Sequence, residues 1–457
     1  TVNGTADARA ELGAVGVASV TAIEQDVEGG SFADLGSAQA DITNSSDVSA
    51  LAQVNAAATT YAIGLGMGAG VVQDVYGNPA SATFSNTGSV VVATSVSADA
   101  DEYALAFGEA AGVAQDAWTD GVAESPTSVS ASIDNDGVVS AGVQAAAGGL
   151  NSAQSTYAAV AFAGARGIAQ TADNADMLAT SLANSSSIIA DADASAAGDI
   201  AAASATAIGY SAGLSDSDGV GTATFLNRST GAIWGNASAT TTGGQVSTAS
   251  ARAMGVSLGG DDLGSLQLDA VNNGLIAATA LATSTGGSTL GSAEAVATGV
   301  QLDTWGGQLA GTFTNSGTGV ITADAVAVGA EGSVEAVGIE SSSFASGLYI
   351  TNRGLVSAYA EGPTAMATGI RIDAFEATST ELPLVPTPLP VATIENHGDI
   401  WAGISTDGGQ TVLRGNAIMT ENAPNPVSIL LENDDPANIF GNIDIGPDDQ
   451  IIVQNGH

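Results

Sequence analysis

Apolar and polar residues alternate with a period of two over long parts of this chain. In the stretch 90–98, every second residue is small and mostly apolar, while the residues between them include two serines. A period of two places successive side chains on opposite faces of a strand, and sustained helical stripes at i, i+3 and i+4 are missing. The pattern therefore predicts an all-β protein.

A short phrase precedes most of these alternating stretches. It reads apolar-x-Asn-x-Gly-x-apolar, most clearly at 84–90, 133–139, 350–356 and 394–400. A fixed repeat of this length indicates an architecture built from stacked structural units. The asparagines of the phrase recur every 37–49 residues, at Asn44, Asn86, Asn135, Asn184, Asn227, Asn272, Asn315, Asn352 and Asn396.

A second phrase, Ala-x-Gly followed by an apolar residue, comes after the first within each repeat. We read each repeat as one coil of a parallel β-solenoid: a first strand, the Asn-x-Gly bend, a second strand, a variable loop and a third strand with Ala-x-Gly. The extra length in 140–163 and 236–250 is expected in loops. The glycines assigned to the second phrase are Gly16, Gly64, Gly108, Gly167, Gly209, Gly255, Gly299, Gly338, Gly369 and Gly403.

The asparagine and glycine of the first phrase suit a tight bend. Asparagine tolerates left-handed backbone geometry, and its amide can bond nearby backbone or the asparagine of the coil above or below. Glycine permits a positive φ. We expect the nine asparagines to form a structural column of turn residues.

Three regions are predicted along the chain. Residues 1–40 are expected to form an N-terminal coil or cap, residues 41–404 the repetitive solenoid, and residues 405–457 closing coils, which carry longer aliphatic side chains. Alternate prolines fill part of 374–392. Because proline cannot donate to a central strand ladder, this segment is expected to leave the coil as a loop.

Composition and charge exclude some classes of binding partner. The 457 residues include 48 Asp and Glu but only 7 Lys and Arg, for a formal net charge of −41. Nucleic acids and anionic membrane surfaces both require a cationic footprint, so neither is an expected partner. The chain has no cysteine, 59 glycines and 4% aromatic residues. A core of such small side chains suits thin stacked layers.

With these phrases in view, the sequence resembles the passenger region of bacterial type V autotransporters. The two phrases recur in such passengers, and the tail is similar to the segment before their translocator, with Asn433-Asp434-Asp435, Ile439-Phe440-Gly441-Asn442-Ile443-Asp444 and Asp448-Asp449-Gln450-Ile451-Ile452-Val453-Gln454-Asn455-Gly456. The resemblance implies a right-handed parallel β-helix of about ten long three-strand coils. It also implies export from a Gram-negative bacterium. It carries over no catalytic residue, and attachment to the outer membrane would need a translocator that this chain does not contain.

Few residue sets suggest chemistry. The two histidines are His397, inside a turn phrase, and His457, so a histidine-assisted nucleophile is not expected and we predict no enzyme. No cofactor is expected, except that paired carboxylates could bind Ca²⁺ weakly. The metal candidates are Asp134 with Asp136, Asp216 with Asp218, and Asp261 with Asp262.

The sequence thus predicts an extracellular or surface-displayed structural or adhesive solenoid, acting as a stalk or adhesin. Expected partners are further copies of the chain, cell surfaces or glycans. Two alternatives stay open. The chain could be the subunit of a self-assembling filament or surface layer, or a polysaccharide-active enzyme that uses two carboxylates.

Overall fold

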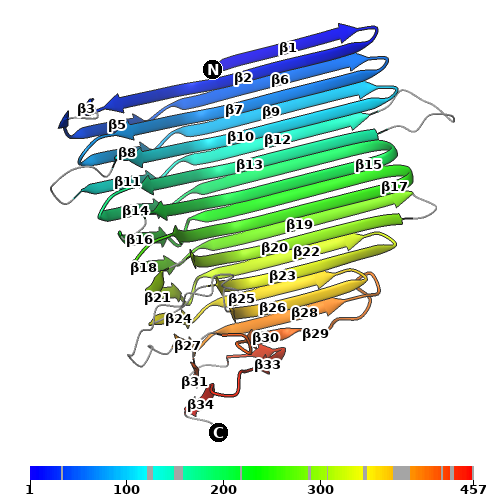
Figure 1. The fold of residues 1–457 in the computed structure, drawn as a ribbon. Coiled ribbons are helices and arrows are strands. Elements are labelled where there is room, and N and C mark those ends of the chain that lie inside the picture. Colours follow the sequence, from blue (N-terminus) through cyan, green and yellow to red (C-terminus); the bar gives the residue numbers. More distant parts are fainter. Residues whose placement is uncertain are drawn as a thin grey trace.

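A computed structural model describes most of the chain, and every element in the described part is a β-strand (Figure 1). The strands form two large sheets with almost entirely parallel pairing, which is the arrangement of a β-solenoid. The described residues are 1–31, 34–120, 127–148, 158–216, 219–286, 290–305, 307–342, 347–373, 392–423, 426–432 and 437–454.

The smaller sheet contains the first strand of each repeat. Most of these strands end at the asparagine of the first phrase, because the chain bends there. The eleven strands are β5 (Ala38–Asn44), β8 (Ala80–Asn86), β11 (Ser128–Asn135), β14 (Met177–Asn184), β16 (Val220–Asn227), β18 (Ser265–Asn272), β21 (Gln308–Asn315), β24 (Leu348–Asn352), β27 (Ala392–Asn396), β31 (Val427–Glu432) and β34 (Gln450–Gln454).

The larger sheet contains the second and third strands. The second strands are β1 (Val2–Ala10), β6 (Asp47–Ala58), β9 (Ser89–Ala100), β12 (Val138–Gly148), β19 (Leu275–Gly286), β22 (Val320–Val328), β25 (Leu355–Glu361) and β28 (Asp399–Ser405). The third strands are β2 (Gly13–Glu28), β7 (Tyr61–Tyr76), β10 (Tyr103–Trp118), β13 (Ala158–Asp173), β20 (Leu290–Trp305), β23 (Glu331–Ser342) and β26 (Thr364–Asp373). Two continuous strands, β15 (Ser187–Ser215) and β17 (Ala232–Asp261), occupy both positions.

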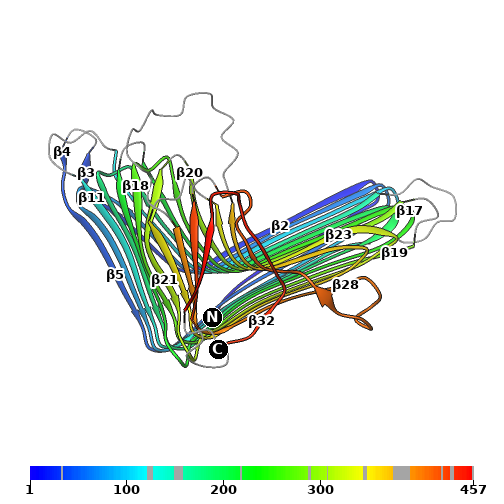
Figure 2. The same cartoon turned by 90° about the horizontal axis from the view of Figure 1, so that it is seen from below.

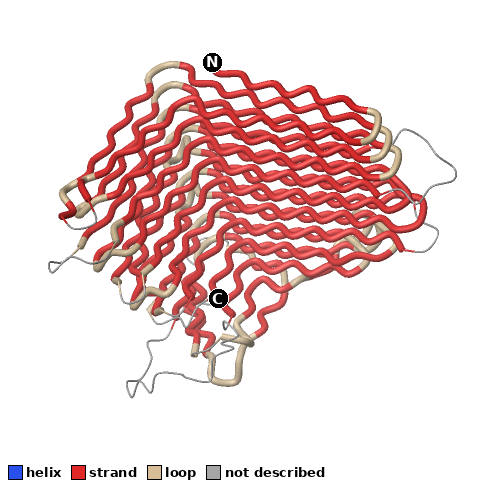
Figure 3. The backbone as a smooth tube through the Cα atoms, turned by 45° about the horizontal axis from the view of Figure 1, so that its top comes forward, coloured by secondary structure: helices blue, strands red, loops and turns tan. Residues whose placement is uncertain are grey.

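The expected loop at 236–250 is wrong, because these residues lie inside β17 and pair with β15. The pairing absorbs the difference in length through a register shift between Gly198 and Ile200. In 140–163, the described residues belong to β12 and β13. Figure 3 shows that the connections gather at the edges of the molecule.

The stacked strands form a V in cross-section (Figure 2). The first strands lie on the outside of one arm and the second strands on the outside of the other. Each long third strand bends between the arms and forms the inside of both. The arm with the second strands has a core of alanines and a few valines, whereas the other arm buries larger residues such as Phe84, Ile133 and Leu182. Small side chains keep the arm with the second strands thin.

A column of glycines marks the bend, which we call the elbow. Its members are Gly70, Gly112, Gly167, Gly209, Gly255, Gly299, Gly338 and Gly369. A Cβ on Gly209 would lie 2.6 Å from Ile233 Cγ2 and 2.7 Å from the carbonyl oxygen of Gly255. Ile233 follows the first phrase of its own repeat, so the two phrases are in contact at the elbow.

Four glycines of the predicted set lie elsewhere. Gly16 and Gly64 pair with each other in the alanine-rich arm, and Gly108 pairs with Ala163 there. Gly403 belongs to the second strand β28. These assignments are wrong because the alanine-rich arm also requires small residues at alternate positions and so produces the same Ala-x-Gly phrase.

The nine phrase asparagines form one buried column along the turn between first and second strands. Each amide nitrogen donates to the side-chain oxygen of the next asparagine at 2.8–2.9 Å, from Asn44 to Asn396. Because each rung satisfies its neighbour, the polar column can lie inside the protein.

A second amide column runs through the partly buried Gln25 and the buried Gln73, Gln115 and Gln170. Gln115 donates to Gln73 at 2.7 Å, and Gln170 donates to Gln115 at 2.8 Å. The hydroxyl of Tyr210 ends the column by donating to Gln170 Oε1 at 2.6 Å. Burial also raises the pKa of Tyr210, so the phenol stays protonated.

The ends of the chain use the same stacking. In residues 1–40, β1 and β2 pair in parallel with β6 and β7. In residues 405–457, β31 and β34 extend the smaller sheet, and the short strands β30 (Asn416–Met419), β32 (Ile439–Phe440) and β33 (Asn442–Asp444) extend the larger one. In the described residues, each antiparallel pair contains a two-residue strand: β29 (Leu413–Arg414) pairs with β28, and β3 (Gly30–Ser31) pairs with β4 (Asp34–Leu35). The predicted loop 374–392 lies outside the described residues except for Ala392.

Candidate functional site on the inner face

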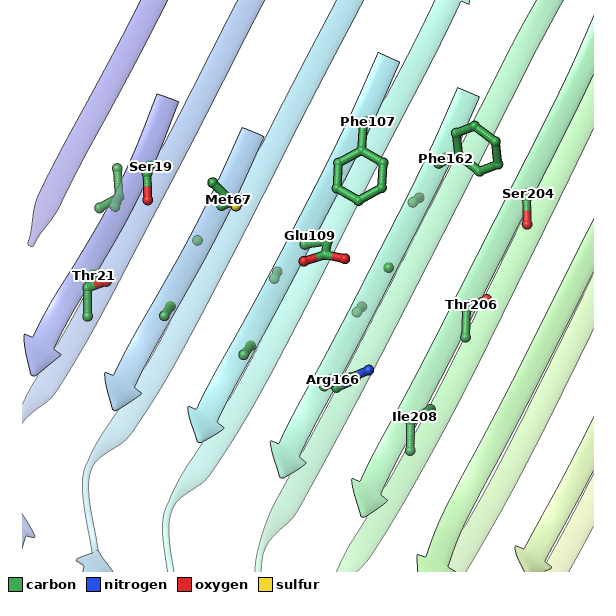
Figure 4. A pocket seen from close by; sticks show the side chains of 18 residues that line it. Ser19, Thr21, Met67, Phe107, Glu109, Phe162, Arg166, Ser204, Thr206 and Ile208 are labelled. Atoms are coloured by element: carbon green, nitrogen blue, oxygen red, sulfur yellow. The ribbon is translucent and has the colours of Figure 1, made fainter. Parts of the chain in front are cut away.

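The inner face of the V is the solvent-facing side of the third strands. A hollow of about 420 Å³ lies on it beside the elbow, lined by β2, β7, β10, β13 and β15. Figure 4 shows Phe107, Phe162 and Met67 on the same side as Glu109 and Arg166. The repeat geometry makes this surface, because in-register strands bring equivalent positions of successive repeats side by side.

Large apolar side chains are exposed around this hollow, and we call them the inner apolar patch. One row across neighbouring strands is Val17, Leu65, Phe107 and Phe162, with the two phenyl rings 6.4 Å apart. The row becomes polar at Ser204. The most exposed members of the patch have 38–54% of their surface accessible, and they are Val15, Val17, Tyr61, Met67, Tyr103, Phe162 and Ile200.

The arm that buries the larger residues carries a row of carboxylates on its inner face, which we call the acidic column. Asp26, Asp74 and Asp116 are exposed and directly in register on β2, β7 and β10. Trp118 Nε1 donates to Asp74 Oδ1 at 3.1 Å, and its ring packs 4.2 Å from that of Tyr76. Like charges opposite one another destabilise a sheet, so this arrangement needs a reason beyond folding.

The acidic column differs from the C-terminal part of the inner face. There Arg371 contacts three carboxylates, those of Glu335, Glu340 and Asp373, the last at 3.0 Å. Among the described residues, no salt bridge reaches Asp26, Asp74 or Asp116. The carboxylates of the acidic column are therefore not paired with a cation as those around Arg371 are.

Asp173 lies beside Trp118 on the next strand. Burial, reinforced by the charge of Asp116, raises the pKa of Asp173 to about 6. Partial loss of water around its carboxyl group and the charge of Asp74 likewise raise the pKa of Asp116, although its side chain reaches the surface. Both shifts reflect the cost of placing several carboxylates together where water has limited access.

We expect Asp173→Asn to stabilise the protein at pH 7 by about 1 kcal/mol, after allowance for solvent screening. Because the folded-state pKa is raised from 3.8, the unfolded chain ionises first. The contribution of Asp173 to stability therefore falls as pH rises from about 4 to about 6. Urea denaturation at pH 4 and pH 7 should show the gain only at pH 7. Ser215→Ala, at the uncharged neighbouring position, should have the same effect at both pH values. An equal gain from D173N at both would contradict the assignment.

The predicted calcium ligands occupy two regions. Asp134 and Asp136 lie on the outer surface near the turn, where Arg228 Nη1 contacts them at 3.8 and 3.1 Å. Asp216, Asp261 and Asp262 lie at the tip of the arm that buries the larger residues. The backbone amide of Asp216 donates to the Asp261 carbonyl at 3.3 Å. Asp218 lies outside the described residues. Calcium binding stays a prediction, and Arg228 already supplies a cation to the first pair.

A further cluster joins Glu395, His397 and Glu432. His397 Nε2 lies 2.6 Å from Glu395 Oε1, and Nδ1 lies 3.4 Å from Glu432 Oε2. One ligand atom from each residue falls within 4.8 Å of the others, so the three could hold a divalent cation or simply form a charge-paired group. From the sequence, His397 is predicted to be a turn residue, and no pattern connects it with Glu432, which belongs to the next repeat.

Comparison with known proteins leaves the chain without an assigned family. No protein-family model matches it, and no curated protein matches it either. Within the part that the structure describes, no helix is long and apolar enough to cross a membrane.

Proposed function

We propose that the protein is a non-enzymatic extracellular solenoid, displayed on or released from a Gram-negative cell, that works as a stalk with an adhesive inner face. The proposal takes the coil as right-handed, with about ten turns of three strands. The observation that carries it is the inner apolar patch, held in register by stacked repeats. Contiguous exposed apolar surface on a folded protein is typical of interaction sites.

The rest of the structure supports a scaffold role. Buried asparagines and elbow glycines recur through the layers, so each repeat is held by contacts to its neighbours. Such a body presents a fixed surface over many layers. The acidic exterior also suits a protein that stays soluble outside the cell.

Surface display and adhesion can be tested together. Antibodies raised against the folded protein should label intact cells of the producing bacterium, and brief protease treatment of those cells should remove the label. Beads coated with the purified protein should adhere to protein-coated surfaces, whereas beads coated with heat-denatured protein should not. Label found only after cell lysis, together with beads that do not adhere, would contradict the proposal.

A further inference from the structure

We propose that the N-terminal half of the inner face binds a basic segment of a partner protein that also carries apolar side chains. This inference rests on the proposed adhesive function and names the chemistry of its partner. The binding surface combines the inner apolar patch on one arm with the acidic column on the other, and the elbow joins them.

The inner apolar patch lies where a ligand can reach it. Its side chains come from neighbouring strands and face solvent, although the same strands bury alanines on their other side. The row of the phenyl rings becomes polar toward the C-terminus, where the equivalent positions are Ser204, Ser250 and Glu294. The solenoid does not require this row to be apolar, so Val17, Leu65 and the two phenylalanines point to a ligand at these layers.

The charge on the facing arm selects the kind of partner. Glu24, Asp26, Asp74 and Asp116 are exposed on the solvent side of the third strands in that arm. Glu109 lies beside the phenyl rings (Figure 4). Arg166 is the cation that lines the hollow. A second copy of this chain, with a formal net charge of −41, would be repelled, and so would a nucleic acid. A cationic ligand would instead relieve the repulsion within the acidic column.

The two arms of the inner face ask for different groups in one ligand. One arm presents exposed apolar side chains and the other presents carboxylates, so a ligand that lies across the elbow must offer apolar groups to one arm and cations to the other. A peptide with leucine or aromatic residues along one side and lysine or arginine along the other meets this requirement.

The test uses the whole chain and a fluorescein-labelled 18-residue peptide of Leu and Lys with an amphipathic pattern. Fluorescence anisotropy should show binding that weakens as salt increases. Phe107→Ser with Phe162→Ser should reduce the affinity about tenfold or more. Asp74→Asn with Asp116→Asn should reduce both the affinity and its salt dependence. Circular dichroism should show that each double variant keeps its strands.

Matched changes on the outer face control for general attraction to an acidic protein. Leu51→Ser with Val91→Ser removes apolar side chains about as exposed as Phe162. Asp41→Asn with Asp47→Asn removes two exposed charges. Neither double variant should change the affinity. A Ser and Lys peptide of equal charge should bind at least tenfold more weakly than the Leu and Lys peptide.

Three results would overturn the inference. One is equal loss from inner-face and outer-face variants. Another is equal binding of the Ser and Lys peptide. The third is evidence that the patch binds something else. This would be dimers of the protein that F107S/F162S abolishes, or binding of a neutral oligosaccharide to the patch when the peptide does not bind. If F107S/F162S beads lose adhesion but the variant still binds the Leu and Lys peptide like wild type, the inference fails while the adhesive function stands. If the protein is absent from the cell surface and wild-type beads do not adhere, the proposed function fails whatever the peptide does.

Discussion

Replacing Gly209 with alanine is expected to lower the free energy of unfolding by about 3 kcal/mol. The new Cβ would lie 2.6 Å from Ile233 Cγ2 and 2.7 Å from the carbonyl oxygen of Gly255. Neither neighbour can move freely, because Ile233 is fully buried and Gly255 is itself an elbow glycine of the next layer. Urea denaturation followed by far-ultraviolet circular dichroism measures the loss.

Gly213 is the matched control for this substitution. It lies on the same strand, four residues further on, and a Cβ there would meet its nearest neighbour, Thr171 Cγ2, at an ordinary 3.6 Å. Gly213→Ala should therefore be neutral or slightly stabilising, because alanine restricts the unfolded chain.

A second variant tests the contact itself. Ile233→Ala removes the side chain that crowds the elbow, so G209A should cost less in the I233A background than in the wild type. Additive losses would show that the Gly255 carbonyl rather than Ile233 sets the clash. A G213A loss as large as that of G209A would show that close approach at the elbow does not set the requirement for glycine.

Much of the repeat unit could be predicted from the sequence because local rules determine it. Alternation with a period of two predicts strands, and the recurrent Asn-x-Gly phrase marks where one strand ends and the next begins. The position of the elbow is harder to predict. Ala62-Ile63-Gly64 fits the second phrase, yet the elbow of that repeat is Gly70. Both sites require small residues, one for a thin core and the other for close approach, and the phrase does not separate them.

The inner face was missed for a related reason. Alternation shows which residues avoid the core, but the direction of the bend decides whether they face into the V or away from it. A usable signal was present, because Leu65, Phe107 and Phe162 each stand five residues before an elbow glycine. Gln73, Gln115 and Gln170 stand three residues after one and form the second amide column. An alignment of the repeats on the elbow glycine identifies both the apolar row and the glutamine column.

The asparagine column leads to the second large expected effect. Asn272→Ala should lower the free energy of unfolding by about 3–5 kcal/mol, because several buried polar groups lose a partner at once. Asn227 Nδ2 now donates to Asn272 Oδ1 at 2.8 Å, and Asn272 Nδ2 donates to Asn315 Oδ1 at 2.9 Å. The amide of Gly274 also donates to Asn272 Oδ1 at 3.3 Å. Urea denaturation measures the change, and hydrogen exchange should show it concentrated in the layers around β18.

A substitution at the next residue, Asn273, distinguishes the contribution of the asparagine column from that of the turn. Asn273 sits in the same bend with a partly exposed side chain, and its backbone amide donates to the Asn227 carbonyl at 2.7 Å whatever its side chain. Asn273→Ala should therefore change stability by no more than about 0.5 kcal/mol. A large loss for N272A beside a small one for N273A would mean that contacts between rungs, rather than the turn preference of asparagine, account for the requirement at Asn272. Equal losses would mean that asparagine serves only the bend, and that the buried amides add nothing beyond what water offers the unfolded chain.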